Sequence, residues 1–342
     1  MKRFVLAAAA VCALAAVAVP VAVQAWGNTG HRLIGVAAMR ALPEDMPAFL
    51  RTPGAAADVG ELSREPDRWK GAGQPHDRER DTAHFVDLDD NGFVFNAAGP
   101  SVDALPRLKS EYDAALIAAG LDVNDAGYLP YAIWDAYQNL VRDFAYWRVL
   151  NAQEAREIDP TKRAWYRVDR ERREALILRD MGVLGHYIGD GSQPHHTTIH
   201  YNGWDRNTPN PEGFTTSRQT HGLFEGAFTA RVARLDLIEA GMAAPKLDGF
   251  DLRARVPAYL RTTLGEVTPF YRLEKAGGFA EGDARGAQFT IARLAAGAAE
   301  LRDFYILAWR DSADDNIGWP AVKVAEVEAG TADPWLAMHG ED

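Results

Sequence analysis

Most of the chain carries apolar residues at the three- and four-residue steps of an amphipathic helix. This pattern predicts helices over 128–150, 165–190, 218–240 and 285–309. Alternating runs that would indicate half-buried strands are scarce. Residues 197–217 are rich in Asn, Pro, Gly and Thr and predict a long loop, which in a compact domain is often functional. We find no repeat and no linker, and therefore expect an all-α fold in which 26–342 form one helical domain.

The first 25 residues follow a different pattern. A basic start, Lys2-Arg3, precedes an apolar run that ends in Val23-Gln24-Ala25. This order of basic, apolar and small residues predicts a secretory signal peptide with cleavage after Ala25. A proline interrupts the apolar run and makes a membrane span the weaker interpretation. We therefore predict an exported protein, periplasmic or extracellular, whose mature chain begins at Trp26.

Composition narrows the chemistry of the mature chain. The single cysteine, Cys12, lies in the predicted signal peptide, so disulfides, a thiol nucleophile and thiolate metal ligands are excluded. Over the full 342 residues, 37 Lys and Arg stand against 48 Asp and Glu, for a formal net charge of −11, and the predicted signal peptide contributes two of the basic residues and none of the acidic ones. This acidic balance argues against a stable complex with nucleic acid or an anionic membrane through bulk charge. It does not exclude either as a substrate.

The segment from His186 to His196 carries the most informative residues. His186 and Asp190 are four residues apart and lie on one face of a helix. A following proline ends that helix, so that His196 can turn back toward the same point. His221 and Glu225 form a second pair with the same spacing. One such pair is more often a surface ion pair or a buried histidine. Two pairs, with His196 between them, favour a metal site of imidazole and carboxylate ligands in a helix bundle.

The order of these residues resembles a known superfamily. Trp26-Gly27-Asn28-Thr29-Gly30-His31 stands at the predicted mature N-terminus, followed by an Asp, a His, the His-x-x-x-Asp-x-x-x-x-x-His segment and a His-x-x-x-Glu pair. This order is similar to the three-zinc superfamily of single-strand-specific nucleases of the nuclease P-one type and bacterial zinc-dependent phospholipases C. The resemblance spans Trp26 to Glu225, and the C-terminal third matches only in helical character. It implies a helical bundle with a trinuclear zinc site in a cleft.

Carried over residue by residue, the resemblance implies three Zn²⁺ ions. The implied ligands fall into three groups: Asp67, His84, His186 and Asp190; then the α-amino nitrogen and carbonyl oxygen of Trp26 with His31 and a shared Asp190; then His196, His221 and Glu225. An α-amino group must lose its proton to bind a metal, and in the uncleaved chain it is an amide. Removal of the signal peptide would therefore complete the second group.

Several neighbouring residues compete for these roles. Asp58 is the alternative to Asp67, and His195 adjoins His196, where the spacing of the superfamily selects His196. We interpret the remaining histidines as ordinary surface residues: His76, His200 and His339. The aromatic residues between Tyr128 and Trp147 follow helical spacing, which predicts core packing, and we assign them no function.

One further motif resembles a calcium-binding loop but is incomplete. Residues 87–92, Asp-Leu-Asp-Asp-Asn-Gly, imitate the start of a calcium-binding loop, but Ala98 stands where that loop needs a bidentate Glu. The calcium interpretation therefore fails.

Zinc with an open coordination position supplies hydroxide at neutral pH, and a pair of ions can clamp both oxygens of a phosphoryl displacement. We therefore expect a secreted phosphodiester hydrolase that uses a zinc-bridging hydroxide. Asp67 would orient the nucleophile or accept its proton. Lys70 would stabilise the transition-state charge, with a solvated surface lysine as the alternative.

Features of the sequence point to both branches of the superfamily. The short step from Trp26 to His31 and the Asp67/Lys70 pair resemble the nuclease branch, in which Phe85 would stack on a base and Asp87 would hydrogen-bond to it. Glu225 and the acidic run after His84 resemble the phospholipase branch, but Thr29 stands at the position of that branch's choline-binding acid. The interval from His84 to His186 is longer than in either branch.

We favour an endonuclease acting on single-stranded DNA or RNA. The alternatives are a phospholipase C that hydrolyses phospholipid head groups and a non-catalytic binding protein stabilised by zinc.

Overall fold

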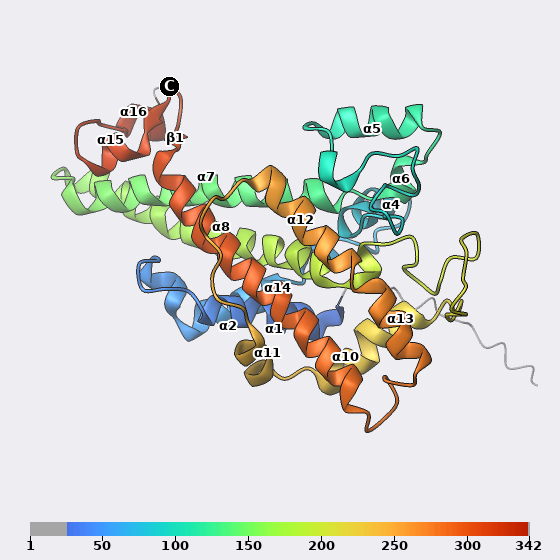
Figure 1. Ribbon diagram of the computed structural model, residues 1–342. Coiled ribbons are helices and arrows are strands. Elements are labelled where there is room, and N and C mark those ends of the chain that lie inside the picture. Colours follow the sequence, from blue (N-terminus) through green and yellow to red (C-terminus); the bar gives the residue numbers. More distant parts are fainter. Residues whose placement is uncertain (1–25, 341–342) are drawn as a thin grey trace, which may run out of the picture.

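The computed structural model describes residues 26–340, so the predicted signal peptide lies outside the described residues. Within this range the fold is all-α, as predicted (Figure 1). Its single sheet is a two-stranded antiparallel hairpin, in which Asn316 pairs with Lys323 and Ile317 with Val322. Outside that hairpin, the described strand-type pairs are isolated bridges in loops.

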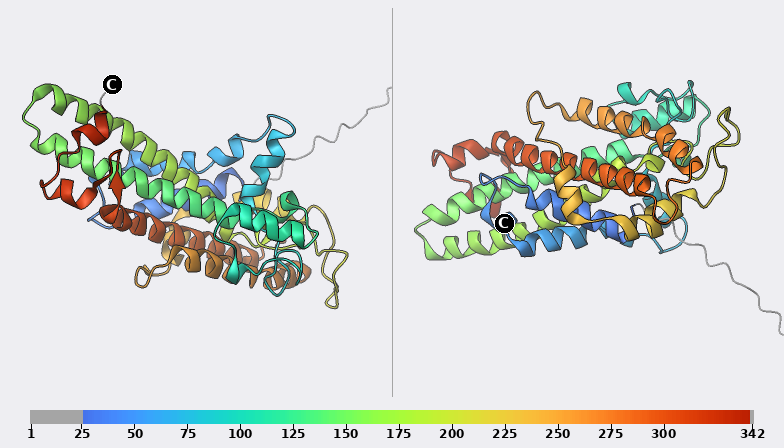
Figure 2. Two further views of the ribbon diagram at one scale, coloured as in Figure 1. Left: turned by 90° about the horizontal axis from the view of Figure 1, so that it is seen from above. Right: turned by 60° about the horizontal axis from the view of Figure 1, so that its bottom comes forward.

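Two long antiparallel helices, α7 (Leu129–Arg156) and α8 (Pro160–Ser192), form a hairpin that extends along most of the molecule (Figures 1 and 2). Helices α1 (Gly27–Arg40), α2 (Pro53–Leu62) and α14 (Ala284–Asp311) pack against α8. The metal-ligand candidates lie near the C-terminal end of α8, where several short elements meet.

The remaining elements are short. In chain order they are η1 (Ala48–Arg51), α3 (Glu65–Arg68), α4 (His76–Asp81), η2 (Thr82–His84), η3 (Val102–Ala104), α5 (Lys109–Ala118), α6 (Val123–Ala126), η4 (Pro194–His196), α9 (Thr220–Gly222), η5 (Leu223–Phe228), α10 (Thr229–Val232), α11 (Leu235–Gly241), α12 (Leu252–Leu264), α13 (Val267–Lys275), η6 (Ser312–Asp314), β1 (Asn316–Ile317), β2 (Val322–Lys323), α15 (Val324–Glu328) and α16 (Trp335–His339).

Local sequence explains where the central helix begins and ends. The Asp159 carboxylate accepts the backbone N–H groups of Thr161 and Lys162, and Pro160 occupies the first helical position, where its missing N–H costs nothing. The helix ends at Ser192, two residues before Pro194 starts the turn η4. This ending directs the chain back across the end of α8, as the sequence predicted.

Three of the four predicted helices are confirmed as α7, α8 and α14, and residues 197–217 form the predicted loop. The prediction of one helix over 218–240 is wrong. That segment forms α9, the π-helix η5 and α10, then an extended break at Ala233 and Arg234, and finally α11. A π-turn repeats close to the α-helical period and leaves the apolar pattern intact, which is why the sequence does not reveal it.

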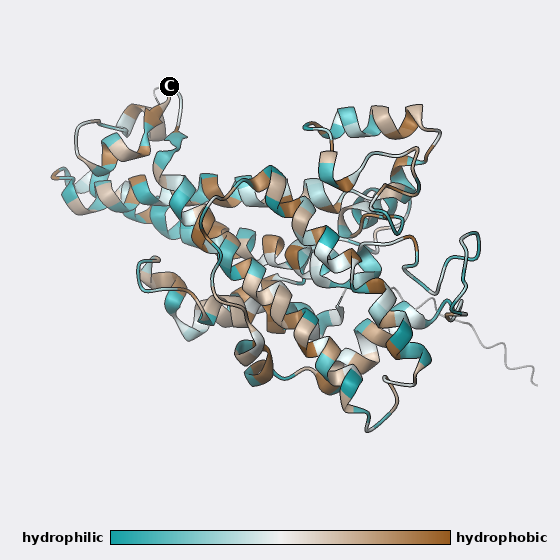
Figure 3. Cartoon of the chain, in the orientation of Figure 1, coloured by the Kyte–Doolittle hydropathy of each residue, from teal (hydrophilic) through white to brown (hydrophobic). Residues whose placement is uncertain are grey.

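The main hydrophobic core runs along α1, α7, α8 and α14 and includes Trp134 and Phe144, which confirms core packing for most aromatic residues of α7. A smaller core joins the C-terminal hairpin and α15 to the outer part of α7. Figure 3 shows hydrophobic and hydrophilic positions alternating around the helices, as amphipathic packing requires. Over residues 26–340, no helix combines the length and apolar character needed to cross a membrane.

Candidate metal centre

Histidine and carboxylate side chains from separate elements meet beside the C-terminal end of α8. They form three buried groups, each with its donor atoms within 4.8 Å of one another. The groups are His31, His186 and Asp190; Asp67, His84 and His186; and His196, His221 and Glu225. These are all the side-chain ligands predicted from the sequence, and each group could hold a metal ion.

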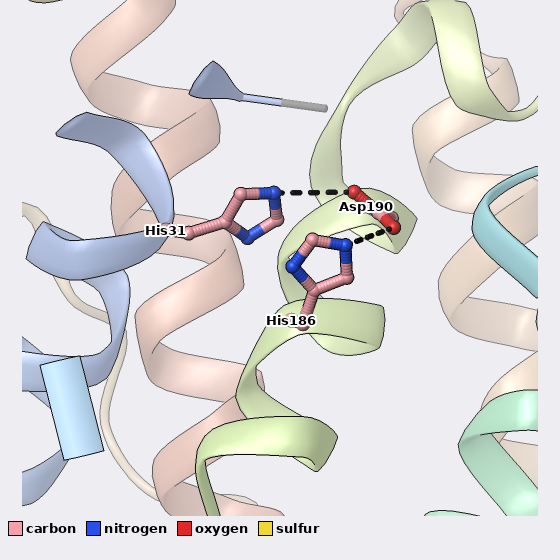
Figure 4. Close-up of side chains that lie close together, drawn as sticks. All are labelled: His31, His186 and Asp190. Atoms are coloured by element: carbon pink, nitrogen blue, oxygen red, sulfur yellow. Dashed lines mark ion pairs between the residues drawn. The ribbon is translucent and has the colours of Figure 1, made fainter. Parts of the chain in front are cut away.

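The first group joins α1 to α8 (Figure 4). The rings of His31 and His186 stack with their centroids 4.0 Å apart, and both are fully buried. His31 Nε2 lies 3.4 Å from Asp190 Oδ1, and His186 Nε2 lies 3.3 Å from Asp190 Oδ2. The two oxygens of one carboxylate therefore face different histidines.

The second group adds α3 and η2. His84 Nδ1 lies 2.9 Å from His186 Nε2, 3.2 Å from Asp190 Oδ2 and 4.0 Å from Asp67 Oδ1. Asp190 thus lies between the first and second groups, the position predicted for a shared ligand. His186 also contacts both groups, whereas the resemblance assigned it to one.

The third group lies on η4, α9 and the π-helix η5. His221 Nε2 lies 2.8 Å from Glu225 Oε2 and 3.1 Å from His196 Nε2. His196 Nδ1 also lies 3.8 Å from Asp190 Oδ1, so this group adjoins the other two. The structure places His196, and not His195, in the ligand group.

Hydrogen bonds fix which ring nitrogens face the centre. His186 Nδ1 donates to the carbonyl oxygen of Ser63 at 2.8 Å, and His196 Nδ1 donates to the carbonyl oxygen of His84 at 2.6 Å. In a neutral ring the Nε2 lone pair then points at the other donors of its group. Unpaired lone pairs that converge on buried carboxylates repel one another, and a cation between them removes that repulsion. The donor set therefore fits metal ions.

Several buried polar atoms of the centre lack a hydrogen-bond partner among residues 26–340. They include both ring nitrogens of His31, Oδ1 of Asp190 and Oε1 of Glu225. A buried polar atom without a partner costs about 1–3 kcal/mol of folding free energy. A ligand that pairs with these three neighbouring side chains would remove that cost. This is independent support for metal binding.

Burial and charge act in opposite directions on the pKa values of the centre. Burial alone would raise the pKa of Asp190, but His186 and His196 lower it well below its usual range. Burial lowers the pKa of His186 to about 3, which leaves this ring neutral and ready to bind a metal. Asp190 and Glu225 outweigh burial and raise the pKa of His196 to about 9, so a metal bound there must displace a proton.

Trp26 packs against the end of α8. Its indole Nε1 donates to the carbonyl oxygen of Gly189 and to Oγ of Ser192, both at 2.8 Å, and the side chain is fully buried. Its carbonyl oxygen accepts the N–H of Gly30 at 3.1 Å. These contacts fix the start of α1 beside the metal centre. The predicted role of the Trp26 amine and carbonyl as ligands stays a prediction.

A cleft of about 610 Å³ opens above the centre, with His84, His196 and His221 in its lining. Lys70 also lines this cleft, and its Nζ pairs with Asp67 Oδ1 at 2.8 Å. Lys70 is therefore held in place and mostly buried, in contrast to a freely solvated surface lysine. The rival acid Asp58 is exposed on α2 and does not belong to any of the three groups.

Phe85 and Asp87 lie in the same cleft. The Phe85 ring is half-buried, so part of it is available for a ligand. Burial raises the pKa of Asp87 well above its usual range, although His196 acts against this. Its Oδ1 is buried without a hydrogen-bond partner among the described residues. A protonated carboxyl at this position can donate a hydrogen bond as well as accept one.

The sequence missed two aromatic residues of the cleft, Phe95 and Tyr201. Phe95 adopts a left-handed backbone with φ 60, which is rare for a residue with a bulky aromatic side chain. Tyr201 is 40% exposed. No motif marks either residue; the only signal was the length of the loop that contains Tyr201.

The prediction that His200 is a surface histidine is wrong, whereas His76 and His339 are exposed as expected. The His200 ring is fully buried and stacks on Trp204 with centroids 3.7 Å apart. Its Nδ1 accepts the N–H of Asp205, and its Nε2 faces Asp90 at 3.3 Å. His200 therefore anchors the long loop.

The fold and the site define an all-α protein with a buried centre of histidines and carboxylates that could hold metal ions. Comparison with known families and with curated proteins finds no family model and no relative that matches this chain.

Proposed function

We propose that the protein is a zinc-dependent phosphodiester hydrolase of the three-zinc type, and that it acts as a nuclease on single-stranded DNA or RNA. The observation that carries the proposal is the placement of Asp190, whose two oxygens face different histidines while a third ligand group adjoins it. A carboxylate in this position suits a pair of closely spaced ions. The nitrogen and oxygen donors, with no thiolate, suit zinc.

Zinc ions at this centre would supply an activated water and would neutralise charge on the phosphoryl oxygens. The chain's own residues perform the other tasks. Asp67 is ionised before the reaction, because His186 and Lys70 lower its pKa against the effect of burial, and it can then accept the proton of the attacking water. Lys70 Nζ, held by Asp67, donates to the oxygen on which negative charge develops.

The cleft favours a nucleotide over a phospholipid head group. The partly exposed ring of Phe85 offers a face for base stacking, worth about 1–3 kcal/mol per base. Asp87 lies in the same cleft with an unsatisfied carboxyl oxygen, which can hydrogen-bond to the base. A quaternary ammonium group has no N–H with which to form that hydrogen bond, and burial disfavours the ionised form of Asp87 that would attract its charge.

The first test measures metal and activity together. We expect protein that begins at Trp26 to contain several zinc ions per chain by elemental analysis, and to hydrolyse single-stranded DNA and RNA but not phosphatidylcholine vesicles. A chelator should abolish hydrolysis and added zinc should restore it. The Asp190→Asn variant should lose more than one zinc ion together with activity, while the control His76→Asn should keep both. A chain without zinc, or an inactive chain with all its zinc, contradicts the proposal.

Export and processing are part of the proposal. The mature chain would begin at Trp26, whose free amine would join His31 and Asp190 in the first group. A variant with Ala25 retained converts that amine to an amide, and we expect it to bind one zinc ion fewer at neutral pH. Equal zinc content in both chains would remove the amine from the ligand set.

A further inference from the structure

A second groove lies beside the metal cleft, on the other side of α4 and η2. It has a volume of about 500 Å³. We call it the basic groove; its lining includes Arg80, Arg107, Lys109, Tyr131, Trp134 and Arg253.

The basic groove and the metal cleft share a wall. Ala83 lines the groove and the next residue, His84, lines the cleft. Tyr187 lines the groove and follows His186, a candidate metal ligand. The rings of Tyr187 and His84 lie 5.9 Å apart. The floor of the groove therefore begins one side chain away from the metal centre.

Four cations of the groove lack an ion-pair partner in the part of the chain that the structure describes. Within residues 26–340, no ion pair involves Arg80, Arg107, Lys109 or Arg253, although most arginines of α8 pair with carboxylates. One groove arginine, Arg179, does pair with its neighbour Asp180, at 2.9 Å. The lining holds these five cations against three carboxylates, Glu79, Asp135 and Asp180, so the groove carries an excess of two positive charges in a chain whose net charge is −11.

Aromatic rings hold two of these cations in position. Lys109 Nζ lies 3.8 Å from the centroid of the Tyr128 ring, and Arg253 Cζ lies 4.0 Å from that of Trp134. The Nη1 atom of Arg253 is buried without a hydrogen-bond partner among the described residues. The face of an aromatic ring orients a cation without neutralising its charge. These two side chains are therefore positioned to bind an anion.

The rim of the metal cleft carries the opposite charge. Its rim carries the carboxylates of Asp77, Asp81 and Asp125, and Lys70 is its one lysine or arginine among the described residues. A polyanion therefore gains little attraction from the rim of the cleft and more from the neighbouring groove. Among the described residues, the unpaired cations of the groove lie on α4, on α5 and the loop before it, and on α12. Cations spread over separate elements suit an anion that repeats along a chain better than a single phosphate.

We propose that the basic groove binds the backbone phosphates of a single-stranded polynucleotide on one side of the bond that is cut in the metal cleft. This inference rests on the proposed nuclease function and adds a second contact region to it. The groove cations supply salt-dependent affinity, while the side chains of the cleft carry out the reaction. Each phosphate neutralised on a single strand adds about −0.7 to the slope of log affinity against log salt.

The test removes three charges from the zinc-loaded protein. The triple variant Arg107→Gln, Lys109→Gln, Arg253→Gln is compared with the control Lys162→Gln. In wild type, Lys162 Nζ lies 4.7 Å from the Trp335 ring, at the far end of the α7–α8 hairpin. KM and kcat are measured on a long oligothymidylate and on a thymidylyl dinucleotide at increasing salt. Binding of a cleavage-resistant phosphorothioate oligothymidylate is measured in parallel.

Loss of three phosphate contacts should reduce the salt slope by about 2, so that a fourfold rise in salt weakens wild type about 20-fold more than the variant. The ratio of kcat/KM for the long substrate to that for the dinucleotide should fall, mainly through KM. The control should keep wild-type values. If Arg253→Gln disturbs folding, the double variant at exposed Arg107 and Lys109 should still lower the slope by about 1.4.

The outcomes separate the two proposals. Hydrolysis with an unchanged salt slope in the variants overturns the groove assignment alone. Groove-dependent binding of the phosphorothioate strand without any hydrolysis overturns the nuclease function and leaves the groove assignment standing. If inorganic phosphate or a mononucleotide displaces the strand at equal concentration, the groove holds a single phosphate and the polynucleotide assignment is wrong.

Discussion

Gly189 lies on α8 between the ligands His186 and Asp190, and its missing side chain makes room for His31. A Cβ added there would lie 2.9 Å from His31 Nδ1 and 3.1 Å from His31 Cε1. Ordinary contacts begin at 3.4 Å, so the His31 ring would have to move by about half an ångström. Metal–ligand distances tolerate about 0.2 Å, so this shift exceeds what the first group can absorb.

The Gly189→Ala variant should therefore bind the metal ion of the first group about 10–100-fold less tightly. Alanine gains about 1 kcal/mol of helix propensity over glycine, while overpacking costs about 1–3 kcal/mol, so global stability should change by about 2 kcal/mol at most. Metal content would be measured after dialysis against a graded chelator. The control is Gly54→Ala on α2, where the added Cβ meets only Thr52 Oγ1, at 3.9 Å. Wild-type metal retention in Gly189→Ala would refute the proposed geometry.

Three further substitutions test the catalytic cleft, a buried acid and the core. Lys70→Gln should lower kcat about 100- to 1000-fold with little change in zinc content, because it removes one transition-state donor and leaves Asp67 in place; unchanged kcat would remove Lys70 from the mechanism. Burial and the nearby Asp143 raise the pKa of Asp180 from 3.8 to about 6, so its ionisation destabilises the fold as pH rises through that range. Asp180→Asn should therefore stabilise the protein by about 1 kcal/mol above pH 6, after allowance for solvent screening, and by nothing below pH 3.8; denaturant unfolding across pH checks the sign. Phe304→Ala should cost about 3–5 kcal/mol of unfolding free energy, since this ring is fully buried, and a urea midpoint equal to wild type would show that the site repacks.

Five of the eight side-chain ligands could be predicted from short-range geometry, whereas His31, Asp67 and His84 were predicted only through the resemblance to the three-zinc superfamily. His186 and Asp190 need only a helix, and His196 needs only the turn that Pro194 causes. The sharing of His186 between two groups could not be predicted, because it depends on where α1 and η2 meet α8. A linear motif does not contain that information.

The misassignment of His200 and the absence of any prediction for the basic groove have the same cause. His200 is buried by Trp204 and faces Asp90, which is 110 residues away in the chain. Among the described residues Arg253 has no ion-pair partner, because α12 places it on Trp134 of α7 rather than beside a carboxylate. Tertiary packing decides whether a polar side chain is solvated, paired with another side chain or available to a ligand. Residue type and spacing do not reveal that packing.

The metal centre also bears on how a chain without a cysteine in residues 26–342 is held together. Its ligands come from α1, α3, η2, α8, η4, α9 and η5, so bound ions would tie residue 31 to residue 225 across one end of the bundle. Most of these elements have only three to six residues, too few to be stable alone. In the absence of metal they would hold several carboxylates and histidines close together with little water to screen them, which is unfavourable. The same ions that we propose for catalysis would therefore also stabilise the short segments that form the cleft, and metal-free protein should lose the structure of this end before that of the α7–α8 hairpin.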